Sequence, residues 1–328
     1  MANKKVFVPA SILIAGLVLF FVGFAMAGFQ LEELSTAIPY EEKTYTDEHV
    51  ASIVVKDSNV PVEFAVSKEN RVTVRYFENE EYQYTIENQN GRLSIEKANH
   101  RKWYLHMFSF EWTTQDVKLV VMVPESFQGD VAISTSNGQI DFSDGHVAKA
   151  TLSTSNGRIT VQNAETMGNL EVKTSNGRIS LDRVKAGGDA QLVTSNANIE
   201  VTELTASNID VKSSAGNISI NNTTAALDIK VKSSNGQVVL DQVSAARNVN
   251  ADTSNSGIKL TKLNVGRSVS CGTSNGKISG TIVGRMEEFS ITSSTTNGDN
   301  NLPKKTDNGE KNANFKTSNS DIEIAFEK

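Results

Sequence analysis

Cysteine, histidine and clustered basic charge are all scarce in this chain of 328 residues. The single cysteine, Cys271, excludes an internal disulfide framework, a multi-cysteine zinc site and an iron–sulfur cluster. The four histidines leave little for a histidine-rich metal site. Lysine and arginine number 32 against 38 aspartates and glutamates, and this net charge of −6 lacks the basic footprint of a nucleic-acid-binding protein. We therefore expect no cofactor, no metal and no nucleic-acid partner.

An uncharged segment near the N-terminus predicts a membrane anchor over residues 1–31. Its apolar centre, Val6 to Phe29, has 24 residues and follows Lys4 and Lys5. As a helix at about 1.5 Å per residue it spans roughly 36 Å, more than the ~30 Å hydrocarbon core of a bilayer. Basic residues before it and acidic residues after it favour a cytoplasmic N-terminus and an extracytoplasmic remainder. A cleaved signal peptide is the alternative, because Ala25-Met26-Ala27 fits a cleavage site, although the run exceeds the usual ~7–15 apolar residues.

The rest of the chain is dominated by an internal repeat of about 20 residues. The hexapeptide Thr-Ser-Asn-Gly-x-Ile, or a close variant, recurs at steps of 19 or 20 residues. The eight regular copies start at Thr135, Thr154, Thr174, Thr194, Ser213, Ser233, Thr253 and Thr273. A degenerate copy lies around Ser293, and a last copy starts at Thr317.

Apolar and polar residues alternate within each copy of the repeat. Around Thr174, for example, the apolar positions are occupied by Leu170, Val172, Ile179 and Leu181. Alternation with a period of two, rich in β-branched residues, predicts strands with one buried face. Each repeat therefore carries two short strands joined at an Asn-Gly corner.

Two architectures fit these strands. Asn-Gly between strands is a strong hairpin signal, which favours a stack of antiparallel hairpins. The alternative is a parallel β-solenoid, in which each repeat is one coil and equivalent residues stack about 4.8 Å apart. The second residue of all eight regular copies is serine, and such identity at fixed spacing favours stacking of like on like. We therefore predict an all-β protein that is a parallel β-solenoid with about 20 residues per coil.

The Thr-Ser-Asn-Gly corner is best explained by a structural role. If the alternation continues, the threonine and the asparagine both face inward, and the asparagine amides satisfy one another in a ladder. The glycine is expected to supply a positive φ that turns the chain. Ala215 interrupts the asparagine column, and Ala197 and Ser256 replace the glycine, so these three corners should be the weakest.

The segments outside the repeats predict caps and loops. Residues 32–43 form an acidic spacer, and residues 44–125 contain strand patterns without the repeat, which predicts an N-terminal β cap. The solenoid then covers residues 126–328, with a polar loop at 295–312 that protrudes before the final coil. An aromatic stretch in the cap is interpreted as a hydrophobic plug. The alternatives are a membrane-interface contact and a partner or glycan site, with contacts through Trp103, Tyr104 and Trp112.

The outward positions of the predicted coils carry no catalytic cluster. Sugar lyases and hydrolases of this architecture need carboxylates or basic residues gathered on neighbouring coils. Arg158 above Arg178 forms only a small basic spot, a second candidate partner contact. The G-x-S-x-G, P-loop and H-E-x-x-H motifs are absent, and Cys271 falls in a buried position as a small core residue. We expect no catalytic, cofactor-binding or metal-binding residues and no enzymatic activity.

The anchor, the segments DSNVPVEF and RKWYLHMFSFEW and the TSNGxI repeats together resemble a bacterial family of β-strand-repeat "putative adhesins" of unknown function. LiaG-like proteins of Gram-positive cell-envelope stress operons belong to that family. The resemblance covers nearly the whole chain. It implies a right-handed β-solenoid that faces outward from the cytoplasmic membrane, and it supplies no catalytic or binding residues.

These observations predict a non-enzymatic, single-pass membrane protein of a bacterial, Gram-positive cell envelope. Its extracytoplasmic β-solenoid would serve as an adhesin or scaffold that binds cell-wall polymer or partner envelope proteins. Two alternatives stay open, namely a polysaccharide-active enzyme built on a β-helix and an accessory protein in envelope-stress signalling.

Overall fold

The computed structural model describes residues 40–79, 82–99 and 117–327, with short stretches at 16–19, 21–22 and 25–26. Most of the predicted anchor, and the whole aromatic stretch with Trp103, Tyr104 and Trp112, lie outside the described residues. No helix within the described part of the chain is both long and apolar enough to cross a membrane. The chain divides into two units, and the unit made of residues 43–76, 84–97 and 118–328 contains all the repeats.

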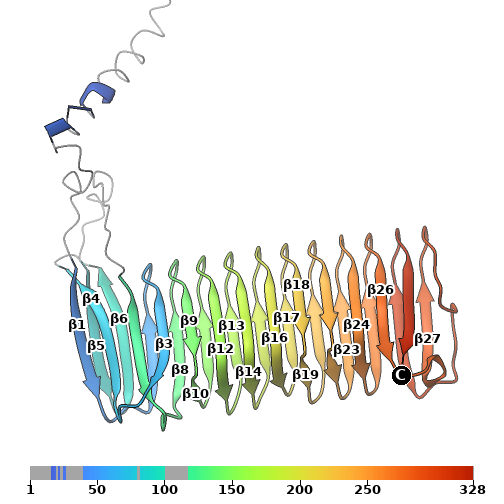
Figure 1. Cartoon of the computed structure of the whole chain (residues 1–328), viewed down its shortest axis with the longest axis horizontal. Helices are drawn as coiled ribbons and strands as arrows, with labels where there is room; N and C mark the ends of the chain where they lie inside the picture. The colour runs from blue at the N-terminus through green and yellow to red at the C-terminus, as the bar shows by residue number, and fades with distance from the viewer. Residues whose placement is uncertain are drawn as a thin grey trace, which may run out of the picture. The chain divides into compact units, whose positions relative to one another are not determined.

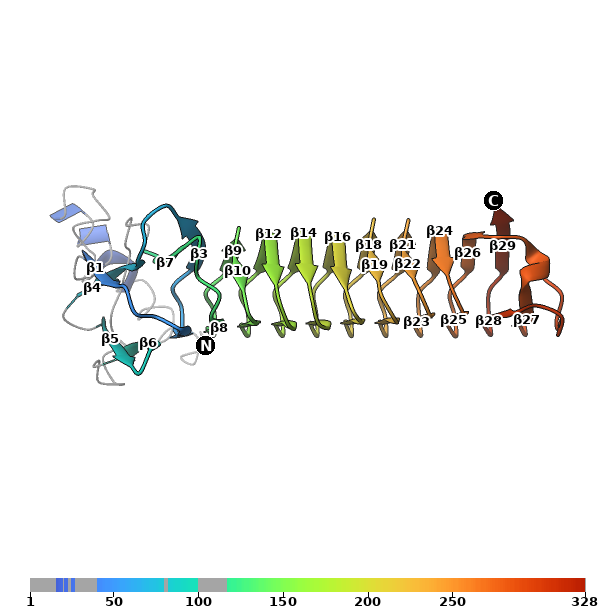
Figure 2. The ribbon, with the colours of Figure 1, turned by 90° about the horizontal axis from the view of Figure 1, so that it is seen from below.

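The repeats form a parallel β-solenoid with coils of about 20 residues. Two sheets enclose the core between them, and we call them sheet A and sheet B (Figure 2). Each coil adds one strand to sheet B and one longer or divided strand to sheet A. In sheet B, β13 (Leu170–Lys173) pairs in parallel with β15 (Ala190–Val193) of the next coil. In sheet A, β14 (Ile179–Ala186) pairs in the same way with β16 (Ile199–Ala206). This parallel pairing confirms the solenoid and excludes antiparallel hairpins at the repeated corners.

The regular coils lie side by side in sequence order from β9 to β26 (Figure 1). The other sheet B strands of these coils are β8 (Asp130–Ser134), β11 (Ala150–Ser153), β17 (Ile209–Lys212), β20 (Ile229–Lys232), β23 (Asn248–Asp252) and β25 (Ser268–Gly272). Their sheet A strands are β9 (Ile140–Ser143), β10 (His146–Val147), β12 (Ile159–Thr166), β18 (Ile218–Asn221), β19 (Thr224–Ala225), β21 (Val238–Asp241), β22 (Ser244–Ala245), β24 (Ile258–Val265) and β26 (Ile278–Val283).

The core consists of the apolar columns that the alternation predicts. Leu170, Val172, Ile179 and Leu181 are all buried, and their counterparts stack above and below them. Cys271 is buried in one of these columns, as expected, and burial raises the pKa of its thiol well above the usual range. It is a packing residue held away from solvent.

The corner ladder exists, but its asparagines face solvent and the prediction that they are buried is wrong. The Asn156 Nδ2 group donates to Asn137 Oδ1 at 2.6 Å, and both side chains are exposed. Of the two residues predicted to face inward, the threonine is buried and the asparagine is not, because the chain begins to turn immediately after the threonine. The Thr154 hydroxyl accepts from the Gly157 N–H at 3.1 Å and donates to the Gly138 carbonyl of the preceding coil at 3.2 Å.

The corner glycines are needed for close approach between coils, and the predicted positive φ is wrong. A Cβ atom on Gly157 would lie 1.9 Å from the carbonyl oxygen of Gly138, and one on Gly177 would lie 1.7 Å from that of Gly157. Neither residue has a positive φ. Successive backbones touch at this corner, so a side chain on Gly157 or Gly177 would require the two coils to move apart locally.

Positive φ values occur instead at a second corner, in residues other than glycine. This bend column lies nine positions after the first residue in the first seven of the eight regular repeats, and its φ values run from 47° to 59°. It consists of Asp144, Asn163, Arg183, Glu203, Asn222, Gln242 and Lys262. The left-handed conformation costs side-chain-bearing residues about 1–3 kcal/mol each, and stacked neighbours with the same bend must hold it in place.

At the N-terminal end, the order of the coils in the stack differs from their order in the sequence. β2 (Ser52–Lys56) and β3 (Val62–Ser67) already form a coil, which pairs with β8 and β9. β6 (Arg92–Asn99) and β7 (Leu119–Pro124) come later in the chain but pair with the opposite edges of β2 and β3. The first coil is therefore covered on both sides. The remaining strands at this end are β1 (Glu41–Asp47), β4 (Val72–Glu78) and β5 (Tyr82–Gln89).

The C-terminal coils show the same exchange. β28 (Lys311–Lys316) lies between β25 and β27 (Phe289–Ser294). A 3-10 helix, η3 (Met286–Glu288), comes directly before β27. β29 (Ile322–Glu327) pairs with β26. The last sheet B strand in the sequence, β28, is therefore not the outermost strand, because the earlier strand β27 lies beyond it.

The polar segment before β28 packs against the end of the stack, and the prediction that it protrudes is wrong. We call residues 299–306 the end strap. On β27, the Ser293 N–H donates to the Lys304 carbonyl at 3.1 Å, and on β29 the Ile322 N–H donates to the Asp299 carbonyl at 2.8 Å. Leu302 between these contacts is only 6% exposed. The strap therefore covers both sheet edges, which blunts a surface prone to edge-to-edge pairing.

Candidate functional site

The bend column creates a groove on the outer face of sheet A. In β14, Asp182 and Arg183 both point outward before Val184 returns to the core, so the regular alternation is broken by one residue. The same break in neighbouring coils produces an open depression of about 390 Å³. This bend groove is lined by His146, Asn163, Ala164, Glu165, Arg183, Val184, Lys185, Glu203, Thr205 and Asn222, which come from five consecutive coils.

One row of the bend groove is a chain of ionic contacts centred on Glu165. The Lys185 ammonium donates to Glu165 Oε1 at 2.7 Å, and His146 Nδ1 lies 3.6 Å from Glu165 Oε2. The hydrogen bond from Lys185 is the main cause that lowers the pKa of Glu165, and the charges of Lys185 and His146 add to it. The glutamate is therefore held ionised between two basic groups on adjacent coils.

A second row lies beside it and is centred on Arg183. The Arg183 Nε group donates to Asn163 Oδ1 at 2.7 Å, and its terminal nitrogen lies 2.7 Å from the Asp182 carboxylate. Two partners on different sides restrict the orientation of the planar guanidinium. The next coils add Glu203, Thr205 and Asn222, whose side chains are exposed and hold no hydrogen bond within the described residues.

The two arginines singled out in the sequence lie on the same face of sheet A but outside the bend groove. Arg158 donates to Gln139 at 3.1 Å, and Arg178 lies 3.5 Å from the Glu200 carboxylate. They precede Asn163 and Arg183 by five residues, roughly 16 Å along a strand. The other candidates, Trp103, Tyr104 and Trp112, belong to the stretch outside the described residues.

The bend groove was not predicted from the sequence, because the alternation was followed in each repeat only as far as the second short strand, which ends near Leu181. A signal was present in the repeats, since an apolar column with Val184 and Leu204 falls three positions after the column with Leu181 and Val201. An odd spacing between two buried positions requires two successive outward residues between them.

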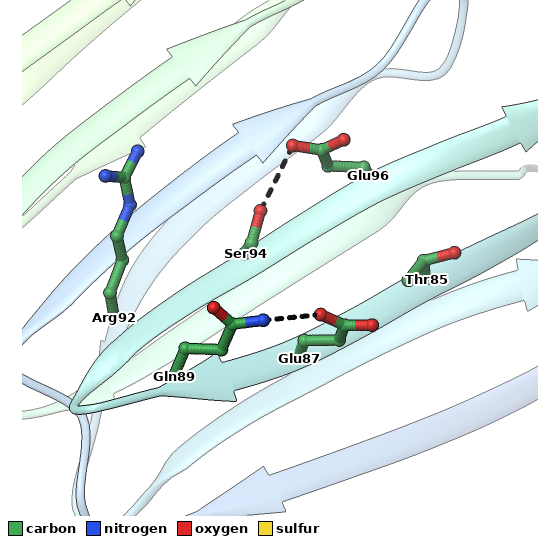
Figure 3. Close-up of a pocket in the computed structure, with 6 residues that line it drawn as sticks. All are labelled: Thr85, Glu87, Gln89, Arg92, Ser94 and Glu96. Atoms are coloured by element: carbon green, nitrogen blue, oxygen red, sulfur yellow. Dashed lines mark hydrogen bonds between the residues drawn. The ribbon is translucent and has the colours of Figure 1, made fainter.

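A second, smaller pocket lies on the outward face of the β5–β6 hairpin (Figure 3). It measures about 300 Å³ and is lined by Thr85, Glu87, Gln89, Arg92, Ser94 and Glu96. Both carboxylates are engaged, because Gln89 donates to Glu87 at 3.0 Å and Ser94 donates to Glu96 at 3.2 Å. Lys56 of β2 also lies 2.8 Å from Glu96. This pocket spans one hairpin only, so it offers much less contact length than the bend groove.

Neither surface resembles a metal centre. Within the described residues, no three histidine, cysteine, aspartate or glutamate side chains are grouped closely enough to hold a metal ion. The bend groove instead presents paired acids and bases together with amide and hydroxyl groups, which are groups that form hydrogen bonds with a polar ligand.

The family model of the Toastrack DUF4097 proteins matches residues 50–267. The chain belongs to this family. The matched region contains the whole bend groove and ends before the exchanged coils at the C-terminus. Membership in the Toastrack DUF4097 family agrees with the resemblance stated from the repeats.

Solved structures that align with most of this Toastrack DUF4097 protein share little sequence with it. A "putative adhesin" from Bacteroides fragilis is 11% identical over 89% of this chain and 99% of its own, with a TM-score of 0.39. A "putative adhesin" from Parabacteroides distasonis is 12% identical over 88% and 97%, with a TM-score of 0.35. A "putative cell adhesion protein" from Clostridium sporogenes is 11% identical over 88% and 100%, with a TM-score of 0.23. No curated protein matches the sequence.

Proposed function

We propose that this protein is a non-enzymatic, membrane-anchored scaffold that binds a cell-wall polymer along its solenoid, outside the cytoplasmic membrane. The apolar run from Val6 to Phe29 supports the anchor. The observation that carries the proposal is the bend groove, which continues across five consecutive coils in the direction in which the coils stack.

The form of the bend groove suits a long chain better than a small molecule. Sites for small molecules are enclosed and mostly apolar, whereas this groove is open and lined by charged and amide side chains. Equivalent positions recur about every 4.8 Å along the stack. Each contact with an extended polymer is weak, but contacts on successive coils belong to one ligand and reinforce one another.

The ionisation of Glu165 argues against a role for it as a general acid in the same groove. A general acid in a glycoside hydrolase needs a raised pKa so that it is protonated at neutral pH. Lys185 and His146 have the opposite effect, because they lower the pKa of Glu165. The carboxylate is thus suited to accept hydrogen bonds from a ligand and not to deliver a proton.

Sedimentation with purified, insoluble cell walls tests the proposal. The full-length chain in mild detergent should pellet with the walls, and the double variant Arg183→Ala, Lys185→Ala should bind about tenfold more weakly, because two preformed contacts are lost. The matched control changes two basic residues of β20 on the outer face of sheet B, Lys230→Ala and Lys232→Ala, and should bind like the parent. Failure of the parent chain to pellet with walls would overturn the proposal.

A further inference from the structure

We infer that the ligand of the bend groove is a glycan strand rich in hydroxyl and amide groups, lying along the stack of coils, and not a polyanionic wall polymer. This inference rests on the proposed function and specifies which component of the wall is bound. Three features of the groove carry it, namely its charge balance, its pattern of donors and acceptors, and its continuity along successive coils.

The positive charges of the bend groove are compensated within the protein. The Arg183 guanidinium is paired with Asp182, and the Lys185 ammonium is paired with Glu165. Glu203 adds a further negative charge that has no basic partner within the described residues. A polyanion requires uncompensated positive charge, and neither this groove nor a chain with a net charge of −6 supplies it.

The unused hydrogen-bonding groups of the groove match hydroxyl groups. A hydroxyl both donates and accepts, so it is best met by a donor and an acceptor side by side. Asn163 keeps its amide N–H groups after its oxygen has accepted from Arg183, while the Glu203 carboxylate and the Asn222 amide oxygen can accept. Donors and acceptors therefore follow one another along the groove from coil to coil, over a length that several linked sugar rings can occupy.

The bend column allows lining side chains to be removed without new backbone strain. Its residues already have a positive φ, which glycine adopts without strain. The triple variant Asn163→Gly, Arg183→Gly, Glu203→Gly strips the centre of the groove while it relieves strained backbone. The matched control is Gln242→Gly with Lys262→Gly, which makes the same backbone change in the same column outside the groove.

Binding of the full-length chain to two probes tests the inference. The first probe is insoluble glycan strands freed of peptides and anionic polymers, and the second is soluble inorganic polyphosphate. We expect binding to the glycan that changes less than about threefold between low and high salt, because few counterions are released. The triple variant should bind about tenfold more weakly, whereas the control should bind within about twofold of the parent. Circular dichroism melting should show both variants folded.

The outcomes separate the inference from the proposed function. Polyphosphate binding that falls steeply with salt, or glycan binding unaffected by the triple variant, would overturn the inference. If intact walls retain the chain and stripped glycan does not, only this inference fails. If neither material retains it, the proposed function fails as well.

Discussion

Replacing Leu302 with alanine is expected to loosen the C-terminal end of the solenoid and to leave its centre unchanged. Leu302 is 6% exposed and lies between the strap residues that bond to β27 and those that bond to β29. It is the buried apolar residue in a segment that is otherwise polar. Removing its side chain therefore weakens the attachment of the strap to both sheet edges at once.

The magnitude follows from the burial. Truncation of a buried leucine to alanine costs about 2–5 kcal/mol, and the lower end applies here because a strap at the end of the stack can relax. Coils contact only their neighbours, so the loss acts locally and does not spread to distant coils. A loss of about 2 kcal/mol corresponds to roughly 30-fold more frequent opening of the strap.

Hydrogen exchange measures this opening directly. The amides to follow are those of Ser293 and Ile322, which donate to strap carbonyls, and that of Ile324, which donates to the Asn301 side chain at 3.0 Å. These amides should exchange roughly 30-fold faster in the variant, while those of β14 keep their rates. The matched control is Leu227→Ala, which truncates a leucine that is 37% exposed. Unchanged exchange at the strap in Leu302→Ala would refute the reasoning, as would an equal effect of the control.

Three further predictions concern the corners and the bend groove. Gly177→Ala should lower the free energy of unfolding by about 1–3 kcal/mol, because its Cβ would lie 1.7 Å from the Gly157 carbonyl oxygen. Urea denaturation measures this change, and a stability equal to that of the wild type would contradict the close packing. Ala215→Asn should restore the interrupted ladder and raise the melting temperature through a hydrogen bond worth about 0.5–1.5 kcal/mol, and a lowered temperature would refute this. Since the folded pKa of Glu165 lies below its ordinary value of 4.5, its ion pair stabilises the fold above that pH and is lost as pH falls through the lower value. An NMR titration should show this lowered pKa, and Lys185→Ala should bring it back toward 4.5.

The repeat by itself determined the strands, the parallel stacking and the composition of the core. Residues such as Leu170 and Ile179 recur every 19 or 20 positions, and a coil that places each copy over the last buries all of them together, as the structure shows. The asparagine ladder followed from the same logic. Its orientation could not be predicted, because strand alternation stops at the turn after Thr154 and the sequence does not mark which residue turns outward.

Tertiary structure alone decided the left-handed backbone of the bend column and the order of the end coils. Arg183 adopts a left-handed conformation that its side chain disfavours, and it does so because identical bends stack on both sides of it. Likewise, nothing in the sequence of β2 indicates that β6, which comes later in the chain, will lie on its outer edge. Nothing in the sequence of β28 indicates that the earlier strand β27 will do so there. Any coil presents the same two open edges, so the choice of neighbour depends on how the whole end of the stack covers its apolar columns.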